Sequence, residues 1–594
     1  MPDQQAPQPH LADLTRWGAR VQPDGATRFR IWAPSVDSLQ IVFQGETPQP
    51  MNRQDGGWYE LTTAAPPGTR YQYLLPTGLQ VPDAASRQQY GDVHGWSVVT
   101  PPDQFPWQAR DWHGRPWNEA VIYEAHAGLM GGFIGMLRHL PELRDLGITV
   151  LEIMPVNAFP GEHNWGYDGT LPFAPDASYG TPDDLKRLVD EAHKLGLEVM
   201  LDVVYNHFGP DGSYISTYCA PFFTEDMHTP WGAAIDFRRP EVLDYYVANA
   251  VYWLNEFRFD GLRFDALHAV RPQEALAPLA AAIRAAADPT RQIHLVMEHE
   301  DNAARFIRPS PDAPGVDAQW ADDFHHCLHV LLTGETGSYY IDYGSPTEQL
   351  ARVLAEGFAY QGETSQLRGR PRGEPSAHLP PSSFVVHLQN HDQIGNRARG
   401  ERLAALAPRD KLRAATALLL LSPMIPLMFM GDEWASDTPF LFFTNHNEEL
   451  AELVRQGRSK EFGIPLSPNP DDPDAIPDPN ARATYDMSRI QRTNPAMHAL
   501  YQDLLALRAQ HIVPAIPGAH ALGCNVLAEG AVAARWQLGN GAELTILLNL
   551  GEATEATLPP GQVLHESAPG LAAQLRAGTL PSAAAFVALT DPAR

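Results

Sequence analysis

The period of the apolar positions changes along the chain, and each change predicts a different kind of structure. From about residue 17 to residue 100, short alternating runs such as TRFRIWAP, LQIVF and RYQYLL are separated by Gly, Pro and Asp turns. This pattern predicts a small β-sandwich. Alternation returns in VAARWQL and ELTILLNL, which predicts a small β domain near the carboxyl end.

Between these two regions, continuous apolar runs alternate with segments of helical periodicity. ITVLEIMPV, at 148–156, is typical of a parallel strand that is buried on both faces. The segment 181–196 has Thr181 as an N-cap, Pro182 at the first helical position and apolar residues at helical spacing. Eight such strand–helix units can be counted, from AVIYEAHAG to IPLMFMGDEW. Eight units close most economically into a (β/α)8 TIM barrel.

The predicted organisation is therefore an α/β protein of three domains. They are an N-terminal β-sandwich at 1–107, a (β/α)8 barrel at 108–518 and a C-terminal β domain at 519–594. A chain of 594 residues is too long for one hydrophobic core, which supports the division. Two Pro-rich stretches, RGRPRGEPSAHLPP and PLSPNPDDPDAIPDPN, are expected to be surface loops of the barrel.

Composition restricts the class of partner. Asp and Glu total 71 against 43 Lys and Arg, a formal net charge of −28, so we expect no nucleic acid and no membrane as partner. Small molecules or neutral polymers are the favoured ligands. Three widely spaced cysteines predict neither a disulfide framework nor a thiolate metal cluster. A polar start and the absence of a long apolar run predict a cytoplasmic protein.

Polar side chains gather where the predicted strands end. Because the carboxyl ends of barrel strands meet at one rim, we expect these side chains to converge there. In FDGLRFDALHAV, Arg263 and Asp265 share one strand face. Taken alone, a structural ion pair is their commoner fate, but the other strand ends favour a functional site. The set is Asp202, Asn206, His207, Arg263, Asp265, His268, Glu298, Asn390, His391 and Asp392.

Three carboxylates with one arginine suit the cleavage of a glycosidic bond. One carboxylate attacks the anomeric carbon, and a second, kept protonated, donates its proton to the leaving oxygen. We expect Arg263 to keep Asp265 ionised, and a less polar setting to raise the pKa of Glu298. Asp392 would then share the positive charge of the transition state.

Four segments resemble, in order and spacing, the motifs of the α-amylase superfamily of retaining glycosidases, glycoside hydrolase family 13. They are DVVYNH (202–207), GLRFDALH (261–268), LVMEHED (295–301) and LQNHDQIGN (388–396). The resemblance implies that Asp265 is the nucleophile, Glu298 the general acid/base and Asp392 the transition-state stabiliser. Glu300 and Asp301 compete for the role of acid, but the alignment and the strand-end position favour Glu298. The residues implied to hold the sugar on the non-leaving side are Tyr167, His207, Arg263 and His391.

Longer segments are similar to the maltooligosyltrehalose trehalohydrolases, among them 320–340, 369–381 and 432–462. That family hydrolyses the α-1,4 bond next to the terminal trehalose of a maltooligosyltrehalose, a step of trehalose biosynthesis that releases trehalose and a maltooligosaccharide. The resemblance implies that DDFHH, Asp322 to His326, helps to recognise the trehalose end, and that the N-terminal sandwich is like a glucan-binding module. After YEAHAG the family has a longer loop than the LMGGF found in this chain.

Further side chains are expected to contact substrate: Trp165, His268, Asp322, Asp323, His325, His326, Gln393 and Asn396. Apolar sugar faces pack on aromatic rings, and predicted loop positions make Trp165 and Trp320 candidate platforms.

His325, His326 and His329 share a helical face but lack an acidic or cysteine partner at metal-ligand spacing, so we expect no metal and no cofactor. The nearest alternative function is a glycogen branching or debranching enzyme. An alternative of another class is a non-catalytic glucan-binding protein.

Overall fold

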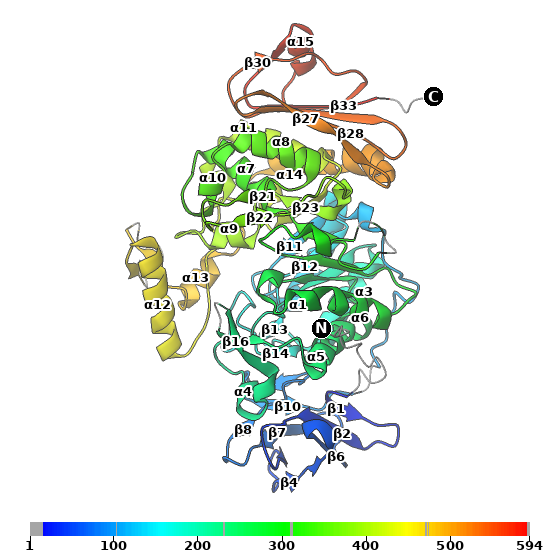
Figure 1. The fold of residues 1–594 in the computed structure, drawn as a ribbon, viewed down its shortest axis with the longest axis vertical. Helices are drawn as coiled ribbons and strands as arrows, with labels where there is room; N and C mark the ends of the chain where they lie inside the picture. Colours follow the sequence, from blue (N-terminus) through cyan, green and yellow to red (C-terminus); the bar gives the residue numbers. More distant parts are fainter. Residues whose placement is uncertain are drawn as a thin grey trace, which may run out of the picture.

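The computed structural model describes residues 16–590, except for 102–103, 230–231, 309, 311–312, 468, 470–471 and 473. Along the long axis of the molecule, an N-terminal pair of sheets, a closed barrel and a C-terminal sheet follow one another (Figure 1). The predicted α/β class, with a barrel between two β regions, is confirmed. The expectations for 1–15 and 591–594 lie outside the described residues, and the three domain boundaries stay predictions.

The N-terminal region is a sandwich of two antiparallel sheets. Three aromatic rings pack edge to face between them: the Phe29 centroid lies 5.4 Å from that of Phe43 and 4.8 Å from that of Tyr71. One sheet has the order β1 (Gly18–Val21), β2 (Thr27–Trp32), β6 (Trp58–Thr63), β5 (Asn52–Arg53). The other has the order β4 (Gln49–Pro50), β3 (Gln40–Phe43), β7 (Arg70–Leu74), β10 (Trp96–Val98), β9 (Gln89–Tyr90), with β8 (Gln80–Val81) paired to β7.

The middle of the chain forms the predicted barrel, and all eight predicted strands are present. Each strand pairs in parallel with its neighbours, and the last closes on the first. The strands are β11 (Ile122–Ala125), β12 (Val150–Ile153), β15 (Glu198–Val203), β18 (Gly261–Phe264), β19 (His294–Met297), β20 (Ala318–Trp320), β23 (Phe384–His387) and β24 (Ile425–Phe429). Apolar side chains such as Ile122, Val150 and Met200 fill the lower barrel interior, so the polar residues lie above a packed core.

Helices cover the outside of the barrel (Figure 1). The predicted helix at 181–196 is α3 (Pro182–Lys194), and Thr181 and Asp184 form a capping box at its start. The others of more than ten residues around the barrel are α5 (Pro240–Val251), α6 (Leu276–Ala286), α7 (Asp322–Thr333), α8 (Pro346–Glu356), α11 (Arg409–Leu421) and α14 (Pro495–Leu507). Three short ones matter for the rim: α1 (Gly132–Leu137), α2 (Leu140–Leu146) and α9 (His391–Gly395).

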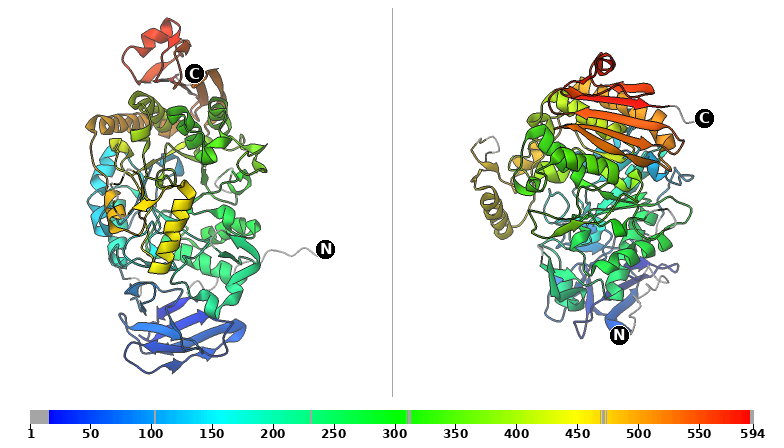
Figure 2. Two further views of the ribbon diagram at one scale, coloured as in Figure 1. Left: turned by 90° about the vertical axis from the view of Figure 1, so that its left-hand side faces the viewer. Right: turned by 45° about the horizontal axis from the view of Figure 1, so that its top comes forward.

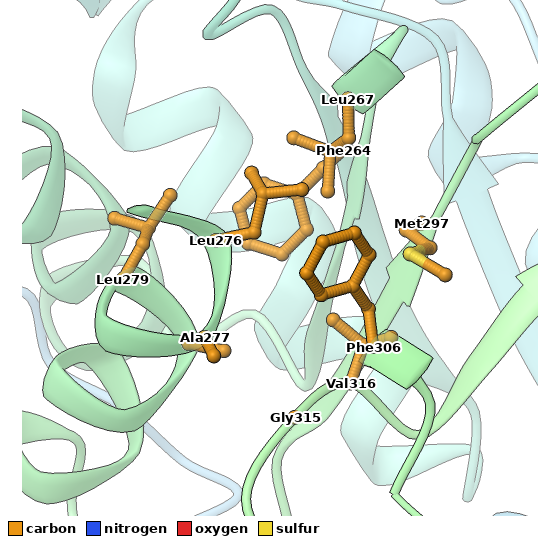
Figure 3. A pocket seen from close by; sticks show the side chains of 10 residues that line it. Phe264, Leu267, Leu276, Ala277, Leu279, Met297, Phe306, Gly315 and Val316 are labelled. Atoms are coloured by element: carbon orange, nitrogen blue, oxygen red, sulfur yellow. The ribbon is translucent and has the colours of Figure 1, made fainter. Parts of the chain in front are cut away.

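The outward faces of β18 and β19 explain why these strands are held firmly. Phe264 and Met297 point away from the barrel interior into a small apolar pocket beneath α6 (Figure 3). Leu276, Leu279 and Phe306 close the other side. Because neighbouring residues of a strand face opposite ways, packing Phe264 outward turns Arg263 and Asp265 toward the interior.

A further helix, α12 (Glu448–Phe462), stands off one side of the barrel (Figures 1 and 2). It contacts the end of α9 through Arg458, whose guanidinium lies 3.5 Å from the carbonyl oxygen of Gly395 and 3.3 Å from that of Arg397, just beyond the helix. Within the described ranges, none of the helices has the length and apolar character that crossing a membrane requires.

The C-terminal region is an antiparallel sheet that lies over the helices at one end of the barrel (Figure 2). Its order is β27 (His520–Ala528), β28 (Ala531–Gln537), β29 (Glu543–Asn549), β33 (Ala584–Leu589), β31 (Gln562–Glu566). The amide of Gly530 donates to Thr347 of α8 at 2.8 Å, which ties the sheet to the barrel.

The two Pro-rich stretches, predicted to be surface loops, each contain at least one short β-strand. β22 (Pro371–Gly373) pairs with β21 (Gln361–Thr364), and β25 (Leu466–Ser467) pairs with β26 (Ile476–Pro477). Pro371 begins β22 and Pro477 ends β26. Each sheet has only two strands, so both prolines are in edge strands, which tolerate a residue without an amide hydrogen.

Candidate active site

The polar strand ends converge around one buried arginine. Arg263 is fully buried, and its Nη1 donates to Asp202 Oδ2 at 2.7 Å and to Asp265 Oδ1 at 3.1 Å. Its Nη2 donates to Glu298 Oε2 at 2.8 Å. The three carboxyl groups come from the ends of β15, β18 and β19, which are adjacent in the barrel. A single guanidinium therefore fixes all three relative to one another.

Trp320 supports this arginine from one side. The Arg263 guanidinium lies 4.0 Å from the centre of the Trp320 ring, and Trp320 is 1% exposed within β20. The expected loop position of Trp320 is thus wrong, and its ring face is occupied by an arginine and not open to a sugar.

Trp165 also differs from a sugar platform. It is 5% exposed, stacks on Phe440 at 5.2 Å between centroids, and donates from Nε1 to the carbonyl oxygen of Leu441 at 3.0 Å. Its ring meets that of His391 edge-on at 5.6 Å. Trp165 therefore contacts the site through His391, because its own faces are packed against protein.

Asn206 holds the carboxyl group of Asp265. Its Nδ2 donates to Asp265 Oδ2 at 2.7 Å and to the Asp265 carbonyl oxygen at 2.9 Å. His207 lies behind this amide, with Nδ1 against Asn206 Oδ1 and Nε2 3.0 Å from the carbonyl oxygen of Tyr167. The sequence placed Asn206 at a strand end without a role. Its position one residue before His207 in DVVYNH was the available signal.

The pKa values of the two central carboxyl groups run opposite to the expectation. Burial and the nearby Glu298 carboxylate raise the pKa of Asp265 well above its ordinary value, against the opposing effect of Arg263. Burial also acts to raise the pKa of Glu298, but Arg263, His268 and the Ala266 amide, 2.9 Å from Oε2, outweigh it and lower that pKa. Arg263 makes its shorter hydrogen bond to Glu298, which favours ionisation of Glu298 more than that of Asp265.

The third predicted carboxylate, Asp392, lies beside His391 at the start of α9. His391 Nε2 is 3.4 Å from Asp392 Oδ1 and 2.9 Å from the Tyr167 hydroxyl, which donates to Asp202 Oδ2 at 2.7 Å. The Tyr167 and His391 rings stack at 5.1 Å. Tyr167, His391 and Asp392 thus continue the network around Arg263.

Glu124 completes this network and was missed in the sequence. Its Oε1 contacts His391 Nδ1, and its Oε2 accepts from the His391 main-chain amide at 3.2 Å. Burial acts to lower the pKa of His391, but Asp392 and Glu124 outweigh it and raise that pKa to about 9. The signal was a glutamate inside the apolar run AVIYEAHAG, where an unpaired charge is costly.

Of the residues expected to recognise the trehalose end, the structure leaves two partly accessible. Asp322, the first residue of α7, keeps 22% of its side chain exposed, and its carboxyl lies 3.6 Å from His387 Nε2. His326 is half-buried, with Nδ1 2.9 Å from the Tyr343 hydroxyl. Both are near enough to the surface to meet a ligand.

Asp323 and His325 are instead engaged by protein. Asp323 is fully buried, accepts from Asn302 Nδ2 at 2.8 Å and from the Ala359 amide at 2.7 Å, and pairs with Arg372 at 3.1 Å. His325 is 1% exposed and uses one ring nitrogen on a main-chain carbonyl and the other, at 2.9 Å, on the Tyr340 hydroxyl. Their polar atoms have protein partners that hold α7, and direct contact of these two residues with substrate stays a prediction.

The remaining predicted residues lie around the same rim. His268 is 3.5 Å from Glu300 Oε1, and Asn396 Nδ2 lies 3.3 Å from Asp392 Oδ1. Gln393 accepts from the Asn390 amide at 3.0 Å, so it caps α9.

The two competing acids are paired elsewhere. Arg368 binds Glu300 at 2.7 Å and Asp301 at 2.8 Å, whereas Glu298 is bound by Arg263.

Metal binding has no geometric support in the part of the chain that the structure describes. No group of three or more His, Cys, Asp or Glu side chains there is arranged to hold a metal ion. His329, the third histidine on the α7 face, pairs with Glu335 at 2.7 Å and stacks on Tyr340 at 4.2 Å.

Two family models match this chain, one in the barrel region and one in the C-terminal sheet region. The family model described as alpha amylase, catalytic domain, matches residues 102–220, and a domain of unknown function, DUF3459, matches residues 519–587. A solved structure titled as a putative alpha amylase from Salmonella typhimurium superposes with a TM-score of 0.90 at 40% identity, over 97% of this chain and 99% of that one. A pullulanase from Anoxybacillus sp. LM18-11 shares the fold at 18% identity, with a TM-score of 0.66 over 97% of this chain and 87% of that one.

Curated relatives match over most of the length. The malto-oligosyltrehalose trehalohydrolase of Deinococcus radiodurans is 39% identical over 576 residues, 93% of each chain. That of Saccharolobus solfataricus is 37% identical over 83% of this chain and 87% of its own. A 1,4-alpha-glucan branching enzyme of Pseudoalteromonas atlantica is 31% identical over only 41% of this chain and 38% of its own. With its closed barrel and its arginine-centred rim of carboxylates, the chain belongs to the malto-oligosyltrehalose trehalohydrolase family of the α-amylase superfamily.

Proposed function

We propose that the protein is a retaining glycosidase that hydrolyses the α-1,4-glucosidic bond next to the terminal trehalose of maltooligosyltrehalose. The products are trehalose and a maltooligosaccharide. The observation that carries the proposal is the guanidinium of Arg263, which binds the carboxyl groups of both Asp265 and Glu298 at the barrel rim. Two carboxyl groups on one guanidinium are close enough to act on one anomeric carbon, as double displacement requires.

The three carboxyl groups then act in two steps. Asp265 attacks the anomeric carbon and forms a glycosyl-enzyme ester, while Glu298 donates a proton to the leaving trehalose oxygen. Glu298 next removes a proton from the water that hydrolyses the ester. Asp392, from the neighbouring α9, stabilises the positive charge of the oxocarbenium-like transition state.

The roles require Asp265 ionised and Glu298 protonated, whereas burial raises the pKa of Asp265 and, at Glu298, Arg263 outweighs burial and lowers the pKa. Because both carboxyl groups are bound by Arg263, moving one proton from Asp265 to Glu298 leaves the net charge of the site unchanged. Such an exchange therefore avoids the cost of placing a new uncompensated charge in a buried site.

The surrounding side chains form two groups, one on each side of the scissile glycosidic bond. Tyr167, His207 and His391 flank the sugar on the non-leaving side, where hydrogen bonds to Asp202, Asn206 and Glu124 hold their rings in place. Asp322 and His326 on α7 contact the trehalose. Three residues support the site through other side chains. Trp165 packs on His391, and Asp323 and His325 hold α7 in place.

The decisive experiment incubates the protein with maltotriosyltrehalose and follows the sugars by chromatography and by proton NMR of the anomeric region. We expect trehalose together with maltotriose that is α at first, because double displacement retains configuration. In Asp265→Asn the rate falls by several orders of magnitude.

Three results would contradict the proposal, each in a different way. New α-1,6 linkages would indicate a branching enzyme. Binding of maltooligosaccharides without any cleavage would indicate a glucan-binding protein. Trehalose released at similar rates by the wild type and by Asp265→Asn would remove Asp265 from its assigned role.

A further inference from the structure

Glu124 is a buried carboxylate to which the proposed reaction gives no role. It lies in β11, is 1% exposed, and directs both side-chain oxygens at one residue, His391. One oxygen contacts the ring Nδ1 and the other accepts from the main-chain amide at 3.2 Å. Because ring and backbone are held by the same carboxylate, the position and the orientation of the His391 ring are fixed together.

The opposite edge of the His391 ring faces the reaction centre. Its Nε2 lies 2.9 Å from the Tyr167 hydroxyl oxygen and 3.4 Å from Asp392 Oδ1. The Tyr167 hydroxyl already donates its proton to Asp202 Oδ2 at 2.7 Å, so it can only accept from Nε2. With a carboxylate at Nδ1 and an acceptor at Nε2, both ring nitrogens carry hydrogen.

The charged and titratable groups around His391 agree with an imidazolium. Two carboxyl groups, Glu124 and Asp392, lie within direct contact, whereas the nearest cation, Arg263, is itself bound to three carboxyl groups. Burial lowers the pKa of the neighbouring imidazoles, to about 4 for His126 and about 3 for His387, so these stay neutral. The other groups that face His391 are Tyr167, Asp202, Glu152 and Glu298.

We infer that Glu124 is a positioning residue that keeps His391 doubly protonated, with the Nε2–H directed at the reaction centre beside Asp392. The inference rests on the proposed function and deepens it. Burial raises the pKa of Asp392, and the imidazolium opposes that rise. Asp392 must be ionised to stabilise a positive transition state, so Glu124 acts on the reaction through His391 without touching the sugar.

The chain offers a matched control in Glu152. It is the register partner of Glu124 on β12, is fully buried, and neither of its carboxyl oxygens has a hydrogen-bond partner among the described residues. Burial, together with Glu124 and Asp202, raises its pKa well above the ordinary value, and a buried carboxyl group without a hydrogen-bond donor favours its uncharged form. Replacing Glu152 by Gln leaves the local charge unchanged, whereas replacing Glu124 by Gln removes a negative charge.

The direct test is NMR titration of the full chain carrying 15N-labelled histidine, with the His391 signal assigned by its loss in His391→Gln. In the wild type we expect a pKa of about 9. In Glu124→Gln it falls by ~1–3 units, the usual effect of losing an adjacent opposite charge. In Glu152→Gln it moves by less than about 0.5 unit.

The kinetic test compares kcat/KM across pH. At low pH His391 is protonated in every variant, and at high pH only the wild type and Glu152→Gln retain the imidazolium. The ratio of kcat/KM between wild type and Glu124→Gln therefore rises by about 3-fold for a shift of one unit and by about 200-fold for a shift of three units between about pH 5.5 and about pH 8.5, since protonation falls tenfold per pH unit above the pKa. The ratio for Glu152→Gln stays flat.

Two outcomes overturn the inference. One is an ordinary pKa for His391 in the wild type, which decides the matter even where Glu124→Gln does not fold. The other is a His391 pKa or a rate ratio that Glu124→Gln leaves unchanged across pH, which would reduce Glu124 to a structural role. A wild type that releases no trehalose would instead refute the proposed function, and the NMR titration would still decide the role of Glu124.

Discussion

The amide of Asn206 offers the sharpest test of Asp265 as nucleophile. Asn206 is 2% exposed and donates to Asp265 Oδ2 at 2.7 Å and to the Asp265 carbonyl oxygen at 2.9 Å. Asn206→Ala removes both hydrogen bonds while leaving Arg263 and the other carboxylates in place. The carboxyl oxygen that loses its donor belongs to the group that is proposed to attack.

The magnitude follows from the kind of bond that is lost. A hydrogen bond to a charged group contributes about 1.5–3 kcal/mol, more than a bond between neutral groups. If that energy is expressed in the transition state, kcat/KM falls by roughly 10- to 150-fold, since about 1.4 kcal/mol corresponds to a factor of ten. The bond to the carbonyl oxygen adds about 1 kcal/mol, which appears in folding stability.

The assay measures initial rates of trehalose release from maltotriosyltrehalose, together with the melting temperature. Tyr205→Phe is the control, because Tyr205 precedes Asn206, is 1% exposed, and donates to Asn249 Oδ1 at 2.6 Å on the helix side of the strand. The control loses a buried hydrogen bond of similar depth, so its melting temperature falls, but its kcat/KM stays within about threefold of the wild type. Asn206→Ala with an equally small effect on kcat/KM, in a folded protein, would refute the positioning argument.

Two further predictions concern stability and differ in their pH dependence. Arg263→Met leaves Asp202, Asp265 and Glu298 without their cation and costs about 3–5 kcal/mol near pH 7. The cost is smaller near pH 5, because without Arg263 burial raises the pKa of these carboxyl groups and favours their uncharged forms. Equal losses of melting temperature at both pH values would contradict this. Asp323→Asn leaves Arg372 without its carboxylate at a similar cost. Burial acts to raise the pKa of Asp323, but Arg372 and Tyr343 outweigh it and lower that pKa in the folded protein. The ionised carboxylate therefore stabilises the fold fully above the unfolded pKa of 3.8, and this stabilisation is lost only as the pH falls through the lower folded pKa. The melting-temperature deficit of Asp323→Asn should therefore be the same at pH 7 and pH 5, and a deficit that disappears at pH 5 would count against it.

The eight barrel strands were predictable because their signal is local. Continuous apolar runs bounded by turns identify buried parallel strands, and the order of the elements then restricts the topology to a barrel. The convergence of Asp202, Arg263, Asp265 and Glu298 followed from the rule that strand ends share a rim. The structure confirms that they meet, because the side-chain direction within a strand depends only on the backbone period.

The surroundings of Trp320 and Asp323 depended on contacts between distant segments. Trp320 was expected to be a sugar platform in a loop, but it is the last residue of β20 and its ring packs against Arg263. Asp323 was expected to meet a sugar, yet Arg372, which is far away in the sequence, takes one of its oxygens. No pattern near either residue carries this information.

The sequence by itself determined the order of the elements, the face on which each side chain lies and the types of residue at the rim, because backbone geometry and hydrophobic period act over a few positions. Only the tertiary structure decided which groups became neighbours, such as Glu124 and His391, 267 positions apart. It also decided that burial raises the pKa of Asp265, whereas Arg263 outweighs burial at Glu298 and lowers its pKa. The physical reason is that burial and Coulomb interaction depend on distances and surroundings in space, which are established only when the barrel closes.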